Sequence, residues 1–240
     1  MQQTPATNAD MPSVSPALDG PILAIDAAGH ACSVALWQHQ AVAAAEHRAM
    51  SHGQAAELLP MIDRVMHEAN LDLRQVAAVA VAVGPGGFTG LRIGLATARG
   101  LGLTIGCPVI GISSFQAMAA HLLGPVLPAD GGDILVALDS RRVEPYLAWL
   151  APDLSFRRPP KLLNLDEIAT LLAEPAIGAI CGDAMQGLAA QIPAAWQRFA
   201  GDNTAAAIAR LATDPARRFI LPADPHYLRP PDISQPKVAG

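Results

Sequence analysis

The stretch VAAVAVAVGPGGFTGLRIGLATARGLGL, residues 76–103, decides the fold. It begins with a near-continuous apolar run, which is typical of a β-strand buried on both faces of a sheet. The run stops at Gly84-Pro85-Gly86-Gly87, and the pattern after it predicts a helix from about Thr89 to Leu103. A buried strand, a glycine-rich turn and a helix in succession indicate an α/β protein.

The glycine turn has two interpretations. Glycines let a backbone approach a ligand, and a helix N-terminus offers free N–H groups to an anion. Alternatively, they supply a tight turn that needs positive φ angles. A P-loop is excluded because no Lys-Ser/Thr pair follows the glycines, and their spacing does not match a dinucleotide fingerprint.

The composition favours a cytosolic globular protein. The chain has 240 residues, of which 51% are hydrophobic, 15% charged and 4% aromatic, so small apolar side chains must fill thin α/β layers. A net charge of −5 gives no general attraction for nucleic acid. Its three cysteines are widely spaced and form no CxxC pair, which indicates reduced thiols. The N-terminus lacks the pattern of a signal peptide. We expect no membrane span, because the most apolar stretch, 88–106, carries Arg92 and Arg99.

The strand pattern occurs twice. ILAID at 22–26 precedes a turn and a strand that ends near a Trp, and ILVALD at 134–139 precedes the same arrangement. This spacing fits a duplicated domain rather than a solenoid. We therefore predict the following segments: a disordered tail at 1–20, an N-terminal lobe at 21–113, a C-terminal lobe at 114–222 and an irregular tail at 223–240.

Further elements follow from periodicity and turn residues. Ser51 is the predicted N-cap of a helix at 52–69, which Pro60 should kink or break. A Pro/Gly-rich linker is expected at 124–133. The other predicted elements are strands at 41–48, 107–112, 146–150 and 176–182, and helices at 165–174 and 204–213. Ser113 or Ser114 is expected to cap a further helix that runs through about Leu123.

No metal or catalytic centre is predicted. His47 and His52 are five residues apart and lie on either side of a strand-to-helix turn, so they do not share a helix face. The sequence also offers no nucleophile with an assignable base, so nothing in it indicates a peptidase.

The helix after the glycine turn is apolar or small almost all round, which predicts burial on more than one face. Arg92 and Arg99 form one narrow stripe. Four small residues, Gly90, Gly94, Ala98 and Gly102, form another row, beside Leu91 and Leu95. Such a row lets a second helix pack closely. This second helix belongs either to a partner or to the predicted segment 52–69 of the same lobe.

Several motifs resemble those of the TsaB family, formerly called YeaZ. The central one is GPGGFTGLRIGLATARGL, at 84–101. The resemblance extends over about residues 21–230 and includes ILAIDAAGHACSVALW, SHGQAAELLPMI, LDSRRVEPYLA, CGDA at 181–184 and HYLR at 226–229. It implies two ribonuclease-H-like lobes of the actin, sugar-kinase and heat-shock ATPase superfamily, with a degenerate nucleotide site.

In that superfamily an Asp ends the first strand of each lobe, and Asp26 and Asp139 occupy these places as vestigial nucleotide-site positions. The turn after Asp26 lacks a hydroxyl in its first two positions, so we expect no firmly bound cofactor. An independent ATP-dependent phosphotransferase that uses Asp26 and Asp139 is the alternative.

The resemblance further implies a non-catalytic activating subunit for the complex that installs threonylcarbamoyl on the tRNA adenosine next to the anticodon. Its expected partners are a TsaD-like catalytic subunit, a TsaE-like ATPase and a second copy of itself, with tRNA bound only through the complex and ATP used by the complex. The implied interface lies on the two N-terminal-lobe helices, at Leu58, Ile62, Val65, Gly90, Leu91, Gly94, Leu95, Ala98 and Gly102.

Overall fold

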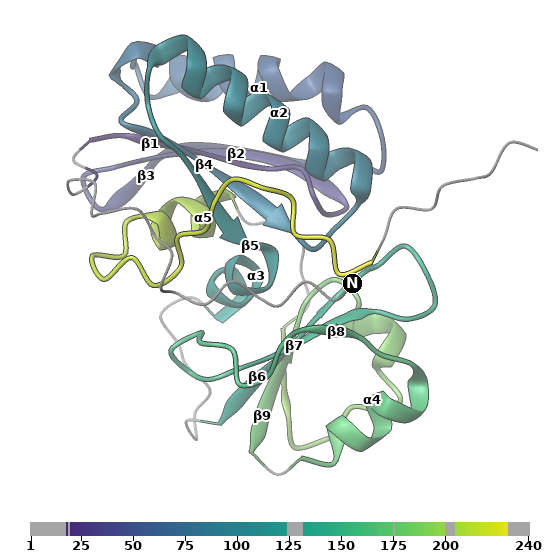
Figure 1. Cartoon of the computed structure of the whole chain (residues 1–240). Helices are drawn as coiled ribbons and strands as arrows, with labels where there is room; N and C mark the ends of the chain where they lie inside the picture. The colour runs from purple at the N-terminus through teal and green to yellow at the C-terminus, as the bar shows by residue number, and fades with distance from the viewer. Residues whose placement is uncertain (1–17, 19, 124–131, 175, 200–204, 230–240) are drawn as a thin grey trace, which may run out of the picture.

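The computed structural model describes residues 18, 20–123, 132–174, 176–199 and 205–229. Two lobes, each built on a five-stranded sheet, lie one above the other (Figure 1). The predicted linker at 124–133 falls almost wholly outside the described residues, as do most of the two predicted tails. Leu18 is described and packs partly buried against the first core.

The first lobe begins with an antiparallel meander and continues with parallel strands. Its elements are β1 (Ile22–Asp26), β2 (Ala31–Gln38), β3 (Ala41–Ala49), α1 (Gln54–Glu68), the 3-10 turn η1 (Leu73–Gln75), β4 (Ala78–Gly84), α2 (Phe88–Ile105) and β5 (Val109–Ser113). The sheet order is β3-β2-β1-β4-β5, and β4 pairs in parallel with β1 and β5.

The second lobe repeats this plan. Its elements are α3 (Ser114–Leu123), β6 (Asp133–Leu138), β7 (Tyr146–Leu150), β8 (Lys161–Leu162), α4 (Leu165–Leu172), β9 (Ile177–Cys181), the 3-10 turn η2 (Met185–Leu188) and β10 (Gln197–Phe199). The last helix of the chain, α5 (Ala205–Ala212), follows them in sequence. The sheet order β10-β9-β6-β7-β8, taken from the β8 edge, matches that of the first lobe. The predicted fold of two ribonuclease-H-like lobes is therefore confirmed.

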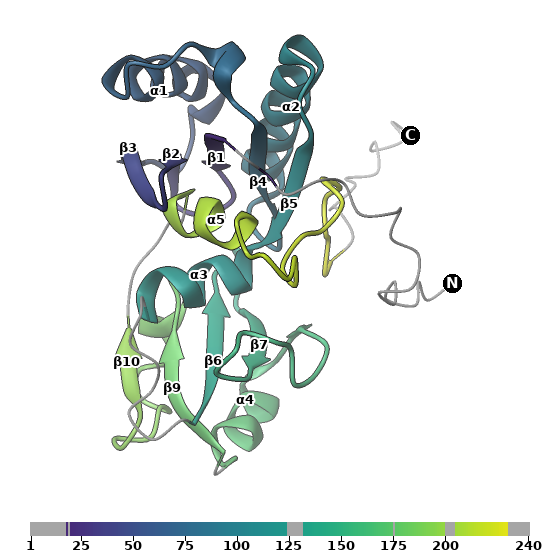
Figure 2. The ribbon, with the colours of Figure 1, turned by 90° about the vertical axis from the view of Figure 1, so that its left-hand side faces the viewer.

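Helices separate and cover the two sheets. α1 and α2 lie on the outer face of the first sheet, while α3 and α5 lie between the lobes (Figure 2). Alternate side chains of β6 face opposite layers: Ile134 and Val136 pack with α3, and Leu135 and Ala137 pack with α4. This two-sided burial explains why the strand at 134–139 reads as continuously apolar.

The sequence placed the helix near 204–213 in the second lobe, but α5 packs under β1, β2 and β4 of the first sheet. Its buried residues, which include Ile208 and Leu211, belong to the first core. An amphipathic pattern shows that a helix buries one face but does not specify which sheet receives it.

The predicted start of α1 is corrected, and of the kink or break predicted at Pro60 the break is wrong. Gly53, with a φ of 92°, is the N-cap in place of Ser51, and the helix runs without interruption through Pro60. Pro60 cannot donate the hydrogen bond that the carbonyl of Ala56 would accept. Both residues are exposed, so water can replace the missing donor.

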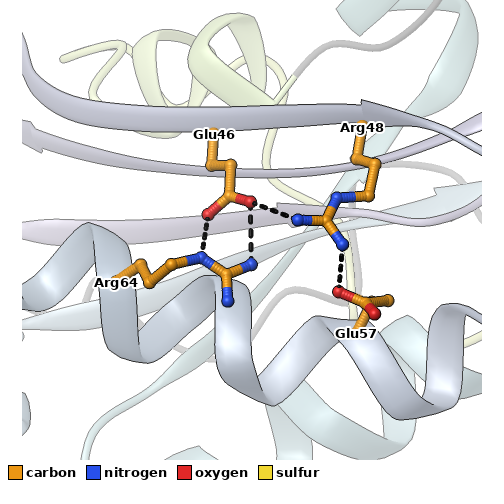
Figure 3. A network of polar contacts seen from close by, with 4 residues as sticks. All are labelled: Glu46, Arg48, Glu57 and Arg64. Atoms are coloured by element: carbon orange, nitrogen blue, oxygen red, sulfur yellow. Dashed lines mark hydrogen bonds and ion pairs between the residues drawn. The ribbon is translucent and has the colours of Figure 1, made fainter.

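Ion pairs attach α1 to the edge strand β3 (Figure 3). The Glu46 carboxylate accepts two hydrogen bonds of 2.8 Å from Arg64, and this pairing lowers the pKa of Glu46. Arg48 donates to Glu57 of α1 and lies 3.5 Å from Glu46. Such exposed pairs contribute little stability singly, but this network orients α1 on the sheet.

Candidate functional site

The two predicted aspartates meet at one closed cleft between the lobes. Asp26 is 5% exposed and accepts a hydrogen bond of 2.9 Å from the Ala28 N–H. Asp139 follows β6 and accepts from the Arg141 N–H at 2.8 Å, while His30 Nε2 lies 2.5 Å from its other oxygen. Both aspartates line a cavity of only about 20 Å³.

Asp183 is a further residue of this cleft, and its role was not predicted from the CGDA motif. Its Oδ1 accepts a hydrogen bond of 2.8 Å from the Asp139 N–H. Burial raises the pKa of Asp183, and the charge of Asp139 adds to this effect, while His30 acts against it. The Ser114 hydroxyl is buried beside these carboxylates without a hydrogen-bond partner among the described residues.

The glycine turn fills the space next to this cleft with the chain's own backbone. The Gly87 N–H donates to the Ala28 carbonyl oxygen at 2.7 Å, and a Cβ at Gly86 would lie 2.6 Å from the same oxygen. A Cβ at Gly90 would collide with the Ala27 carbonyl oxygen. The glycines therefore serve close approach, and the backbone that they approach here is the Ala27–Ala28 turn.

Arg141 connects the lobes above that turn. Its φ of 61° is unusual for a residue with a side chain, and its guanidinium donates a hydrogen bond of 3.0 Å to the Gly29 carbonyl oxygen. A second-lobe residue thereby reaches the first lobe close to Gly87, at the start of α2.

The small-residue row of α2 faces its own sheet and not a second helix. A Cβ at Gly94 would contact Val81, Ala27 and Ile25 at 3.7 to 3.9 Å, and Ala98 is fully buried. The residues predicted for the interface are all buried within this single chain: Leu58, Ile62, Val65, Gly90, Leu91, Gly94, Leu95, Ala98 and Gly102. A small-residue row predicts close approach, but a strand and a turn take the place assigned to a partner helix.

The solvent-facing side of α1 and α2 carries exposed apolar residues. Leu59 of α1 is 56% exposed, and on α2 Leu103 is 86% and Phe88 is 36% exposed. This surface, called the outer helical face below, is the accessible part of the two helices on which an interface was predicted.

The Arg92–Arg99 stripe holds the last described segment of the chain. Arg92 donates a hydrogen bond of 3.0 Å to the Tyr227 hydroxyl and lies 3.7 Å above the Phe88 ring. Arg99 pairs with Asp224 and donates to the Ala223 carbonyl oxygen at 2.7 Å. The His226 N–H also donates to Val83 of β4. Residues 219–229 therefore form a strap along α2 and the sheet.

Other candidate groups lie apart. His47 is on β3 and His52 precedes α1, and within the part of the chain that the structure describes no three His, Cys, Asp or Glu side chains gather as metal ligands do.

Burial raises the pKa of the Cys32 thiol to about 11 and that of Cys181 to about 12. Among the described helices, none has the length and apolar character to cross a membrane.

The repeated sheet topology and the aspartate at the end of the first strand of each lobe define a two-lobed protein of the actin and sugar-kinase superfamily, here with a closed cleft. Residues 47–212 match the family model described as "TsaD: tRNA N6-adenosine threonylcarbamoyltransferase". The chain belongs to this family, among its TsaB (YeaZ) proteins.

Similar proteins agree with this placement. The chain is 40% identical over 127 residues to the tRNA threonylcarbamoyladenosine biosynthesis protein TsaB of Escherichia coli, an alignment that covers 53% of each chain. The chain thus spans about half the length of the curated relatives it matches. A Pseudomonas aeruginosa crystal structure, of an uncharacterized protein with similarity to peptidase YeaZ, aligns at 25% identity with a TM-score of 0.71, over 88% of this chain and 100% of that one. YeaZ from the same organism aligns at 24% identity and the same TM-score, over 87% and 100%.

Proposed function

We propose that this chain is a non-catalytic subunit in the biosynthesis of tRNA threonylcarbamoyladenosine, where it activates a TsaD-type catalytic subunit. The family, and relatives named as tRNA threonylcarbamoyladenosine biosynthesis proteins, support a role in this pathway. The closed cleft supports the non-catalytic role.

The cleft is the observation that carries this proposal. A volume of about 20 Å³ holds roughly one water molecule, and a nucleotide needs several hundred Å³. To admit a nucleotide, the lobes would have to separate and break the His30–Asp139 and Arg141–Gly29 contacts. We infer that this chain holds no nucleotide firmly by itself and that ATP is used by other members of the complex, such as a TsaE-type ATPase.

The outer helical face is the proposed partner surface. Exposed Leu59, Phe88 and Leu103 provide the apolar contact that a protein interface needs at its centre. The same face can receive a second copy of the chain, so a homodimer competes with the TsaD-type partner. A net charge of −5 makes tRNA contact through the partner more favourable than direct binding.

The experiment measures binding of a purified TsaD-type subunit and the threonylcarbamoyl-transfer activity of the mixture. Leu103→Asp should weaken binding and stimulation without lowering the melting temperature, because Leu103 is 86% exposed. Val143→Asp is the matched control, since Val143 is 81% exposed on the second lobe. If both variants bind the TsaD-type subunit equally well, the outer helical face is not the partner surface.

Titration of the isolated chain with Mg-ATP tests the non-catalytic assignment. We expect no turnover, and any binding through the phosphate groups alone should be unchanged in Asp26→Ala. The alternative, an ATP-dependent phosphotransferase, draws on the presence of Asp26 and Asp139 at one cleft. ATP turnover that disappears in Asp26→Ala would establish that alternative and reject the closed-cleft argument.

A further inference from the structure

A second depression, of about 430 Å³, lies where α1 and α2 begin. Its walls are the first turn of each helix, the residues before α1, Gly29 and the side chain of Arg141. Gly29 is the one lining residue that it shares with the aspartate cleft, and none of its lining residues is acidic.

Both helices direct their N-terminal ends to this depression. The N-cap is Gly53 in α1 and Gly87 in α2, and neither helix receives a side-chain cap hydrogen bond. The first N–H groups of a helix have no acceptor within that helix. The helix dipole adds a partial positive charge at each end. Ala55 of α1 and Thr89 and Gly90 of α2, all in first turns, line the depression.

Gln54 gives an independent indication of a ligand. It is the first residue of α1, it is 6% exposed, and it lines the depression. No described residue hydrogen-bonds its side-chain amide. Among the described residues Ser114 Oγ, and not the Gln54 amide, is the fully buried side-chain atom without a partner, so the Gln54 amide is accessible from the depression that it lines. A ligand in the depression could supply the acceptor for this amide.

Positive and polar groups complete the wall. The Arg141 guanidinium reaches over from the second lobe, and His52 lies at the start of α1 with Nδ1 2.8 Å from the Ser51 hydroxyl. Glu57, the acidic residue in the first turn of α1, is paired with Arg48 of β3 (Figure 3). It does not line the depression.

We propose that this depression binds the phosphate group of a small molecule, through the first-turn N–H groups of α1 and α2, the Gln54 amide and the Arg141 guanidinium. The volume exceeds that of a phosphate ion, so an organic ester of phosphate also fits. Because Arg141 belongs to the second lobe, the complete site exists only while the lobes are closed. The proposal does not depend on partner binding, since every group comes from this chain.

The test is a titration of the isolated, isotope-labelled chain with inorganic phosphate, pyrophosphate and ribose 5-phosphate at low ionic strength, followed by amide NMR. We expect saturable shifts centred on Gln54, Ala55, Thr89 and Gly90. Tighter binding of ribose 5-phosphate than of phosphate assigns the site to an organic ester, and equal binding assigns it to the free anion. Absence of saturable shifts at these amides with all three probes overturns the proposal.

Ala55→Asp separates the site from the fold. An acidic residue in the first turn interacts favourably with the positive end of the helix dipole, so the melting temperature should stay the same or rise. The same carboxylate repels phosphate, so affinity should fall about tenfold or more. Gln54→Ala and Arg141→Ala should also weaken binding, whereas the control Arg74→Ala, an exposed arginine of η1, should not. Wild-type affinity in Ala55→Asp would show that phosphate binds elsewhere.

Discussion

The imidazole Nε2 of His30, in the first lobe, lies 2.5 Å from the carboxylate Oδ2 of Asp139, in the second lobe. The backbone N–H of Asp139 donates in turn to the Asp183 carboxylate, so these three residues from both lobes form one half-buried polar network. This network closes the space that a nucleotide would need, and it makes the stability of the closed form dependent on pH.

Asp183→Asn tests that dependence. Burial raises the pKa of Asp183 above its ordinary value of 3.8, so in the folded chain this group retains a proton that the unfolded chain has already lost. Its contribution to the free energy of unfolding therefore falls as pH rises through and above that value. Asparagine keeps an acceptor for the Asp139 N–H but has no charge to bury. In chemical unfolding measured from pH 4 to 7, the free energy of unfolding should decline less in the variant than in wild type.

Asp153→Asn is the control with the opposite sign. Hydrogen bonds from Ser155 lower the pKa of Asp153, so this group adds stability above its ordinary pKa and loses it as the solution is acidified. The variant should be less stable than wild type at pH 7 and similar to it in acid. If Asp183→Asn behaves in the same way, the buried-charge explanation of Asp183 is wrong.

Gly90→Ala and Gly100→Ala form a matched pair on α2. A Cβ at Gly90 would collide with the Ala27 carbonyl oxygen, and we expect severe destabilisation or failure to fold. A Cβ at Gly100 meets nothing within 4 Å, so this variant should gain about 0.5–1 kcal/mol from helix propensity. Urea unfolding of both variants checks the pair, and equal effects would contradict the packing of α2 on the turn.

Ala98→Leu addresses the orientation of the small-residue row. Ala98 is fully buried against the sheet, so the added volume should lower the free energy of unfolding by about 1–3 kcal/mol. Ala96→Leu, on the exposed side, should change it by less than about 0.5 kcal/mol. Thermal melts compare the two, and normal stability of Ala98→Leu would mean that the row does not face the sheet.

Tyr227→Ala should loosen the strap at 219–229. It removes the acceptor of the Arg92 hydrogen bond and the ring that packs 5.3 Å from Phe88. We expect faster amide exchange at His226, whose N–H bonds to Val83, with little change in β1 or β6. Tyr227→Phe keeps the ring contact, so its rate of amide exchange at His226 should lie between those of Tyr227→Ala and wild type. Unchanged exchange at His226 would show that the strap is held elsewhere.

The thiols should differ sharply in reactivity. Burial raises the pKa of all three thiols, but Cys32 and Cys181 are fully buried, whereas Cys107 is half-buried and accessible to a reagent. Iodoacetamide at pH 8, with mass spectrometry, should label Cys107 first in the folded chain and all three only after unfolding, because the thiolate is the reactive form. Cys107→Ser should then remove nearly all native-state labelling. Early labelling of Cys181 would reveal opening of the second lobe.

Local patterns allowed most elements to be predicted, while contacts between distant residues were beyond them. The bounds of the strand that ends at Gly84 and of the helix after it were predicted to within a few residues. Both follow from local properties of the sequence, namely a continuous apolar run and the glycines that end it. The spacing of Gly90, Gly94 and Ala98 predicted close packing, but whether a sheet or a helix lies opposite depends on tertiary structure. The Arg92–Tyr227 bond joins residues 135 positions apart, which no periodicity reveals.

The position of α5 has a consequence for the order in which the chain folds. The core of the first lobe includes Ile208 and Leu211, yet the whole second sheet lies between these residues and β5 in the sequence. During synthesis the first lobe must therefore wait, with one face of its sheet uncovered, until the ribosome has passed residue 212. The second lobe, whose strands and α4 form one continuous segment, can complete its sheet earlier. The lobe that begins first in the sequence is thus completed last.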